Sequence, residues 1–326
     1  MKLNFLAAFL FSALLFDVGG CGMPSFLVTP VNDAQTLQEV QVQPGQGVFS
    51  KKIAVIEVTG VLLNADTGGL LTPSENPLNR FTEELNKAAD DSNVKAVVLR
   101  VNSPGGSVGT SDTMYDEVLK FRKKTGKPVI ASAQEIDASG AYYVSCAADK
   151  IVVHPAGLMG SIGVIFEDFD FVGTMNLFGV RPEAIKSAPM KDIGSPFKHM
   201  TDEERAVLQG LVDSYFTRFK GIVTSNRPIN SDEIVKIADG RVFTGEEAVT
   251  LHLADQVGRL DDAIDLAKTM SNSSGAQVIM YKHPYGSSGS IYATTNVPAP
   301  QANVTTLQLP RSDAMIPGGF YYLWMP

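Results

Sequence analysis

The sequence predicts an α/β domain in which helices flank a mostly parallel β-sheet. Runs rich in Val and Ile, typical of buried strands, alternate with amphipathic helical patterns between residues 52 and 153. The chain has 326 residues, of which 44% are hydrophobic and 19% charged, so it can bury a large core and is too apolar for general disorder. An order of strand, helix, strand and helix is typical of βαβ units, whose strands are parallel.

The first residues predict a targeting segment. Lys2 precedes an almost wholly apolar run over residues 3–16, which is shorter than the ~20 apolar residues that a membrane-spanning helix needs. The following "VGGC" is similar to the lipobox of bacterial lipoproteins, so we expect a signal peptide over residues 1–20 and a lipidated Cys21. An ordinary secretory signal and an uncleaved anchor are the alternatives, and all three place the rest of the chain outside the cytoplasm. The polar, turn-rich residues 21–51 predict a linker.

Residues 52–280 predict the ordered domain. Its strands are expected at 52–62, 94–102, 127–134 and 151–153, and its helices at 77–91, 113–124, from 139–140 onward, 201–227, 244–258 and 260–270. The strand runs are almost continuously apolar, which indicates burial on both faces. Thr201 and Glu204 form a capping box that begins the longest helix.

Residues 281–326 predict a low-complexity, flexible tail, because they are rich in Ser, Thr, Pro and Asn. The aromatic end of this segment, "FYYLWMP", is either solvated or docked on a neighbour.

Composition excludes several classes of function. The net charge is −8 and no long basic run occurs, so nucleic acid is not an expected partner. The two cysteines, Cys21 and Cys146, lie far apart, and the four histidines are scattered without any zinc-binding spacing. We therefore expect no metal and no cofactor.

Two short stretches could carry chemistry. "NSPGGSV", residues 102–108, follows a predicted strand, and the backbone N–H groups of its two glycines could form an oxyanion hole; an ordinary strand-to-helix turn is the alternative. In "DASGAYYV", Ser139 stands where a helix begins. It is either the N-cap of that helix or a nucleophile whose oxyanion faces the helix N-terminus.

A serine nucleophile needs a general base. His154 is near in sequence but lies at the far end of the next predicted strand. Lys186 and Lys191 lie in the apolar, Pro-containing stretch "AIKSAPMKDIGSPF". A lysine acts as a base only when it is neutral, and burial among apolar atoms favours the neutral amine. A solvated surface lysine is the alternative for each of them.

Four stretches in series carry a family resemblance: "VVLRVNSPGGSV", "DASGAYYVSCAADKIVVHPAGLMGSIGV", "IKSAPMKDIGSPF" and "DGRVFTGEEA" with "LADQVGRLDDAI". In this order and spacing, residues 52–270 resemble the signal peptide peptidase A family, which are S49 serine peptidases. The resemblance implies a ClpP/crotonase-like fold, with a mostly parallel sheet built from repeated ββα-type units.

The resemblance also implies a Ser/Lys dyad. Ser139 falls on the family's nucleophile and Lys191 on its general base, while Ser161, in "GSIG", falls on the serine that orients the lysine. Two departures, His154 where relatives often have Asn and Pro189 shortly before the base, remove no catalytic group. The implied oxyanion donors are the backbone N–H groups of Gly105, Gly106 and Gly140.

The implied function is a serine endopeptidase that cleaves hydrophobic peptides, such as remnant signal peptides, at the membrane of a bacterial cell envelope. Its domain would face the periplasm or the cell exterior, held by the N-terminal anchor. Short members of the family form homo-oligomeric rings in which the lysine reaches the serine of the adjacent protomer. A crotonase-like acyl-CoA enzyme and a non-catalytic scaffold on the same fold are the alternatives.

Overall fold

The structure is a computed structural model that describes residues 37–46, 51–65, 76–282 and 319–325. All of these belong to one compact unit, Thr36–Pro326. The predicted signal peptide, Cys21 and most of the predicted tail lie outside the described residues. Within the described ranges, every helix is too short or too polar to cross a lipid bilayer.

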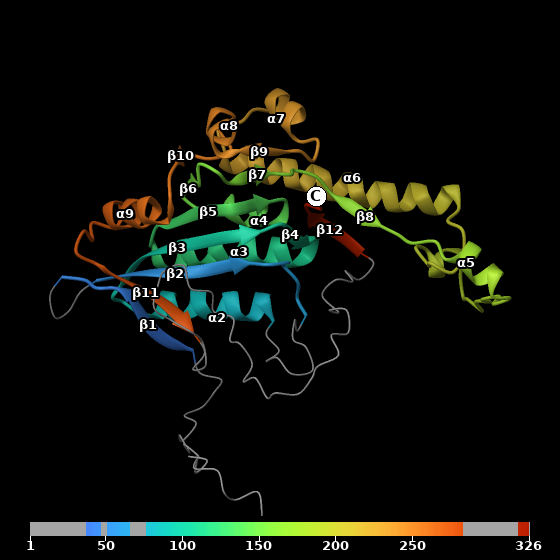
Figure 1. Ribbon diagram of the computed structural model, residues 1–326, viewed down its shortest axis with the longest axis horizontal. Helices are drawn as coiled ribbons and strands as arrows, with labels where there is room; N and C mark the ends of the chain where they lie inside the picture. The colour runs from blue at the N-terminus through green and yellow to red at the C-terminus, as the bar shows by residue number, and fades with distance from the viewer. Residues whose placement is uncertain (1–36, 47–50, 66–75, 283–318, 326) are drawn as a thin grey trace, which may run out of the picture. The chain divides into compact units, whose positions relative to one another are not determined.

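A mostly parallel sheet forms the centre of this unit (Figure 1). Its main path within the described residues runs in the order β1 (Gln38–Gln43), β11 (Gln277–Lys282), β2 (Lys52–Thr59), β3 (Val94–Ser103), β5 (Val129–Ala138), β6 (Lys150–Val153) and β10 (Gln256–Val257). Strand β5 pairs with β6 through its first half and with β7 (Leu158–Gly160) through its second half. The antiparallel pairs are β1 with β11, and β7 with β9 (Val242–Thr244). The predicted α/β class is confirmed.

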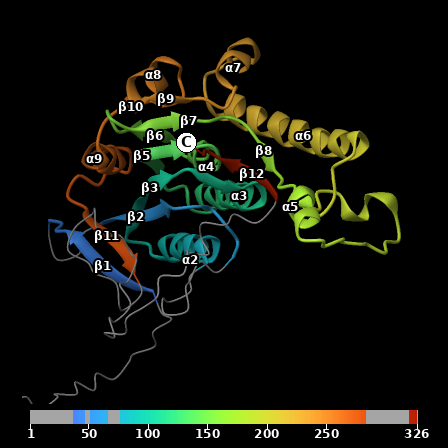
Figure 2. The ribbon, with the colours of Figure 1, turned by 45° about the vertical axis from the view of Figure 1, so that its right-hand side comes forward.

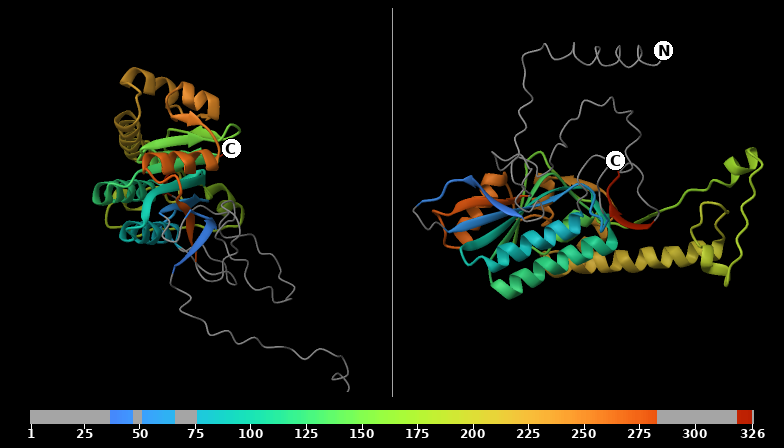
Figure 3. Two further views of the ribbon diagram at one scale, coloured as in Figure 1. Left: turned by 90° about the vertical axis from the view of Figure 1, so that its left-hand side faces the viewer. Right: turned by 90° about the horizontal axis from the view of Figure 1, so that it is seen from below.

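Helices cover both faces of this sheet because its central strands are apolar on both. Ala54 and Ile56 of β2 face a core cluster that contains residues of α2 (Pro77–Asp90), α3 (Val108–Thr125), α4 (Gly140–Ser145) and α6 (Asp202–Asn226). Ile53 and Val55 face the opposite cluster, which includes residues of α9 (Leu260–Met270). Figure 3 shows α2, α3 and α6 on the same side of the sheet.

A small second sheet lies beside the first. Strand β12 (Gly319–Leu323) is its middle strand and runs antiparallel to both β4 (Gly105–Ser107) and β8 (Ile165–Glu167). Figure 2 shows β12 beside β8. Strand β12 lies in the segment expected to be a flexible tail, and β1 lies in the expected linker. Both strands are stabilised by pairing with strands that are remote in sequence. The local pattern of hydrophobic residues does not predict such pairing.

The other differences from the predicted elements are local. The helix expected over 244–258 is limited to α8 (Gly245–Thr250), after which His252 adopts a positive φ of 62° and the chain enters β10. Helix α3 begins earlier than expected, because the Ser107 side chain caps it by accepting from the Thr110 backbone N–H. The remaining elements are α5 (Val172–Leu177), the 3₁₀ helix η1 (Pro189–Asp192) and α7 (Ser231–Ile237).

Candidate active site

Ser139 lies at the sharp turn between β5 and α4. Its backbone adopts φ 54° and ψ −116°, and its N–H donates to the Gly160 carbonyl oxygen at 2.7 Å. A non-glycine residue in such a conformation costs about 1–3 kcal/mol, which the surrounding structure must offset. The Ser139 side chain makes no capping hydrogen bond to α4. Ser139 therefore stands at the N-cap position of α4 without capping the helix through its side chain.

The glycines predicted as oxyanion donors converge beside Ser139. A Cβ added to Gly140 would lie 3.1 Å from the Gly106 nitrogen, so these two backbones are in close contact. The Gly140 N–H is in the first turn of α4, where amides have no partner within the helix. The Gly105 N–H, in contrast, donates to the Ser103 hydroxyl at 3.1 Å. The Gly105 N–H is therefore engaged in a side-chain hydrogen bond, and Gly106 and Gly140 remain candidates for the oxyanion hole.

Ser161 lies close to Ser139 in the fold. It follows β7, has a positive φ of 50°, and donates its N–H to the Arg241 carbonyl oxygen at 2.7 Å. Ser139 and Ser161 both line one cavity of about 500 Å³. The structure thus brings together two of the three predicted catalytic side chains.

Lys191 is not part of this cavity lining. It lies in the exposed helix η1, within residues 163–203, none of which is buried. Figure 1 shows α5, in the same segment, beside the end of α6 that is remote from α7. The structure of a single chain therefore does not bring the predicted base to Ser139.

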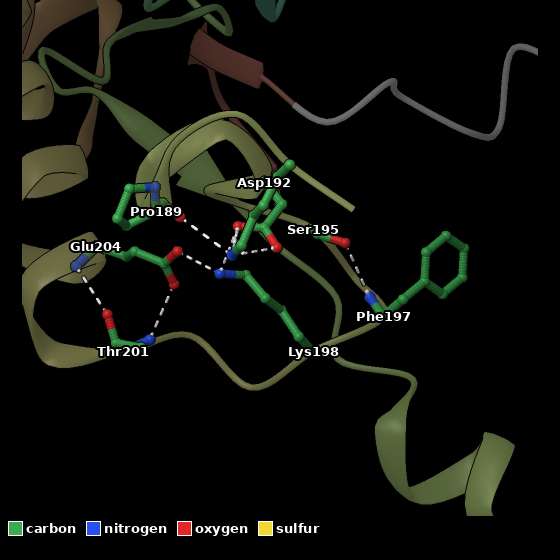
Figure 4. A network of polar contacts seen from close by, with 8 residues as sticks. Pro189, Asp192, Ser195, Phe197, Lys198, Thr201 and Glu204 are labelled. Carbon is green, nitrogen blue, oxygen red and sulfur yellow. Dashed lines mark hydrogen bonds and ion pairs between the residues drawn. The ribbon is translucent and has the colours of Figure 1, made fainter. Parts of the chain in front are cut away.

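The neighbouring lysines are occupied by carboxylates. Lys186 and Lys198 bind Asp192 at 2.7 and 3.0 Å, and Lys198 also binds Glu204 (Figure 4). Hydrogen bonds from Lys186 and Lys198 lower the pKa of Asp192 to about 2. Among the described residues, Lys191 has no such ion pair. Of the two lysines considered from the sequence, Lys191 is thus the one left available.

Asp137 is a site-adjacent residue that the sequence analysis missed. It is fully buried two residues before Ser139; its Oδ2 accepts from the Ser145 hydroxyl at 2.8 Å, and its Oδ1 has no partner within the described structure. Burial raises the pKa of this carboxyl to about 7. The available signal was an acidic residue two positions before the candidate nucleophile.

His154 has a local role. Its Nδ1 accepts from the Ala156 backbone N–H at 3.1 Å in the turn after β6. It does not line the cavity with Ser139. Within the described ranges, no group of three His, Cys, Asp or Glu side chains is arranged to hold a metal ion.

Several known proteins resemble this chain in sequence. Residues 121–274 match the family model described as Peptidase family S49. A protein of Enterococcus faecium named as a signal peptide peptidase SppA is 34% identical over 73% of this chain and 69% of its own length. Protease 4 of Salmonella typhi is 34% identical over 67% of this chain and 34% of its own length.

Solved structures with a similar fold include two proteases. A mutant of a membrane-bound stomatin-specific protease matches with a TM-score of 0.45 and 14% identity, over 67% of this chain and 85% of its own. A ClpP1 mutant from Listeria monocytogenes matches with a TM-score of 0.43 and 14% identity, over 64% of this chain and 94% of its own.

Proposed function

The chain belongs to the signal peptide peptidase A family of S49 serine peptidases, and we propose that it is an endopeptidase with Ser139 as nucleophile and Lys191 as general base. The observation that carries this proposal is the strained Ser139, which makes no helix cap and lies against the Gly106 and Gly140 backbones. Ser161, which shares the cavity, is proposed to orient the lysine.

The proposed reaction is acyl transfer. Neutral Lys191 accepts the Ser139 proton while the oxygen bonds to the carbonyl carbon of the substrate. The N–H groups of Gly106 and Gly140 stabilise the developing oxyanion, a contribution of about 3 kcal/mol per donor in comparable sites. The C–N bond then breaks, the leaving amine takes the proton from the lysine, and water hydrolyses the ester.

Lys191 is proposed to act on the Ser139 of an adjacent copy of the chain. This is supported by its exposure and by exposed apolar side chains in the same segment of the chain, since large exposed apolar patches mark interaction surfaces. Leu177 is 85% exposed, Phe178 78% and Ile185 fully exposed. A second copy that covers this segment would bury these side chains and remove Lys191 from water. In a ring, each protomer would give its lysine to the next.

The proposed substrates are extended hydrophobic peptides, such as remnant signal peptides. The cavity beside Ser139 includes apolar residues of three segments, among them Ile162, Val212 and Leu323. The relative named as a signal peptide peptidase supports the same class. We further propose that Cys21 is the lipid anchor and that the enzyme works at the membrane of a bacterial cell envelope.

Mixing two inactive variants tests the dyad and the ring together. We expect Ser139→Ala and Lys191→Ala each to lower turnover of an apolar fluorogenic peptide by at least about 1,000-fold. When the two are co-assembled in equal amounts, about a quarter of the sites in a ring pair an intact serine with an intact lysine, so activity returns to that fraction. Ser214→Ala and Lys124→Ala, at exposed positions, are the matched controls.

The result separates three cases. Recovery in the mixture supports a dyad shared between chains. Loss in both variants without recovery places both groups in one chain, which refutes the shared site. Unchanged turnover in either variant removes that residue from the catalytic machinery.

A further inference from the structure

Lys191 is carried by a helix that is too short to fix its own orientation. Helix η1 has four residues, none of them buried. The Lys191 N–H donates to the Ala188 carbonyl oxygen at 3.1 Å, and the Ile193 N–H donates to the Met190 carbonyl oxygen at 3.2 Å. A single 3₁₀ turn of this length is not stable in isolation. Other contacts must therefore determine the direction in which Lys191 leaves the backbone.

The Lys186 side chain binds both ends of η1. Its Nζ donates to the two carboxylate oxygens of Asp192 at 2.7 and 2.8 Å, and to the Pro189 carbonyl oxygen at 3.1 Å. Pro189 and Asp192 are the first and last residues of η1. One ammonium group thus connects the beginning of this helix to its end, and the Pro189 ring restricts the backbone between them.

The Lys198 side chain joins η1 to the longest helix. Its Nζ lies 3.0 Å from Asp192 Oδ1 and also binds Glu204 (Figure 4). The Glu204 side chain is only 3% exposed, and it accepts from the Thr201 N–H at 3.1 Å in the capping box that begins α6. Asp192 is therefore connected, through one lysine, to a buried carboxylate at the end of a 25-residue helix.

The backbone after η1 is in close contact with β8. A Cβ added to Gly194 would lie 3.2 Å from the ring of Phe166. The preceding residue of β8, Ile165, lines the cavity that contains Ser139. Contacts on the α6 side and on the β8 side thus both restrict η1, although the backbone of this helix is exposed.

Asp192 acts on Lys191 through the backbone. Adjacent residues of a helix point in different directions, so they do not bind each other. Within the described structure, the ion pairs of Asp192 are those with Lys186 and Lys198. Their hydrogen bonds lower the pKa of Asp192 to about 2, so this carboxyl is ionised at neutral pH. With Glu204, the four charges sum to zero, and the carboxylate nearest to Lys191 in sequence is already paired.

We propose that Asp192 is a positioning residue for the general base: with Lys186 and Lys198 it fixes η1, so that Lys191 reaches the Ser139 of an adjacent copy. Lys186, which the sequence left as an alternative base, is thereby assigned to hold η1. Asp192 acts within the chain that supplies the lysine and not within the chain that supplies the serine. This inference rests on the proposed function, since it takes Lys191 as the general base.

A chain-specific mixture tests this inference. In co-assembled Ser139→Ala and Lys191→Ala, the first chain supplies the lysine and the second the serine, so Asp192→Asn can be added to either. Added to the Ser139→Ala chain, it should lower the recovered turnover about 30-fold, because a displacement of about 1 Å can cost 100-fold. Added to the Lys191→Ala chain, it should leave the recovered turnover within about 2-fold. Asp116→Asn, at an exposed position of α3, is the matched control and should change neither.

Every other pattern overturns the inference. Equal losses in both arrangements would assign Asp192 to folding or assembly. Unchanged turnover in both would show that Asp192 does not position the lysine. A loss confined to the serine-supplying chain would place its action on another part of the site.

Steady-state kinetics of single variants gives a second readout, and it decides where the parent mixture recovers no turnover. Lys186→Met should lower kcat about 10-fold with KM within about 2-fold, because it affects the base and not the binding of peptide. Lys186→Arg keeps donors for both the carboxylate and the carbonyl, so kcat should stay within about 3-fold. Lys123→Met removes the same charge from an exposed position of α3 and should change neither constant. A raised KM at constant kcat, or equal losses for Met and Arg, would contradict the positioning role.

Hydrogen exchange separates this inference from the chemistry. In the full chain, the backbone amides of residues 188–195 should exchange at least about 10-fold faster in Lys186→Met and in Asp192→Asn than in the wild type, with exchange in α3 unchanged. If this acceleration occurs in a wild-type background without peptidase activity, the proposed function fails while the ordering of η1 by these side chains stands. Unchanged exchange in both variants overturns the inference whatever the activity.

Discussion

Replacing Asp137 by Asn should make the folded domain more stable, and increasingly so as pH rises. Burial raises the pKa of Asp137 from an ordinary 3.8 to about 7. The folded state therefore holds this proton more tightly than the unfolded state, and between these two pH values folding is linked to proton uptake. Stability conferred by the protonated carboxyl is present at low pH and is lost as pH rises toward 7.

The magnitude follows from the size of the shift. Each pKa unit corresponds to about 1.4 kcal/mol, so the wild-type chain loses on the order of 4 kcal/mol between pH 4 and pH 8 through this group. The amide introduced by Asp137→Asn does not titrate. Its oxygen can still accept from Ser145, as Asp137 Oδ2 does. The stability difference between the variant and the wild type should therefore grow by about 1.4 kcal/mol per pH unit up to pH 7 and then stay constant.

Urea unfolding followed by circular dichroism at pH 5, 6, 7 and 8 measures this difference. Asp116→Asn, at an exposed position of α3, is the matched control and should show no such trend. A difference between Asp137→Asn and wild type that is the same at all four pH values would refute the reasoning, because it would mean that the carboxyl titrates alike in both states.

Three further substitutions have defined outcomes. In Gly106→Ala the new Cβ would lie 2.0 Å from the Leu62 carbonyl oxygen, so we expect a loss of about 3 kcal/mol in urea unfolding together with lost peptide turnover; a stable, active variant would contradict the glycine requirement. Thr201→Ala removes the side chain that caps α6 and should cost about 1 kcal/mol, with faster amide exchange in the first turn of α6 and unchanged exchange in α3. Arg227→Ala breaks an ion pair at 2.9 Å between the buried Arg227 and the partly buried Asp255 and should cost about 2 kcal/mol at neutral pH. A loss that persists when Asp255 is also replaced by Asn would show that packing, not charge, is responsible.

The central strands could be predicted from the sequence because burial on both faces favours a largely apolar run. Strand β3 is the example: of its ten residues, only Lys95 and Asn102 are not buried. Strand β12 could not be predicted, although its sequence is rich in aromatic residues. Its stability comes from Gly106 and Phe166, which lie far away in sequence, and an isolated strand has no local signature of such partners.

The candidate site divides in the same way. Ser139, Ser161 and the glycines follow from short motifs, because backbone geometry at a sharp turn restricts residue type locally. The hydrogen bond from the Gly105 N–H to the Ser103 hydroxyl depends on the position of the Ser103 side chain. Residue spacing in the sequence does not predict that position. Lys191 and Ser139 do not lie together within one chain of this structure. Neither the sequence nor the fold of a single chain therefore predicts the distance between them in an assembly.

The backbone conformation of Ser139 has an evolutionary consequence. A residue other than glycine is held at φ 54° there, so Ser139→Gly would relax the turn and gain stability while abolishing the hydroxyl. Selection for thermal stability alone would thus favour catalytically inactive variants of this peptidase. If serine persists at this position in a lineage, selection acts on turnover, because the folded domain would be more stable with glycine there.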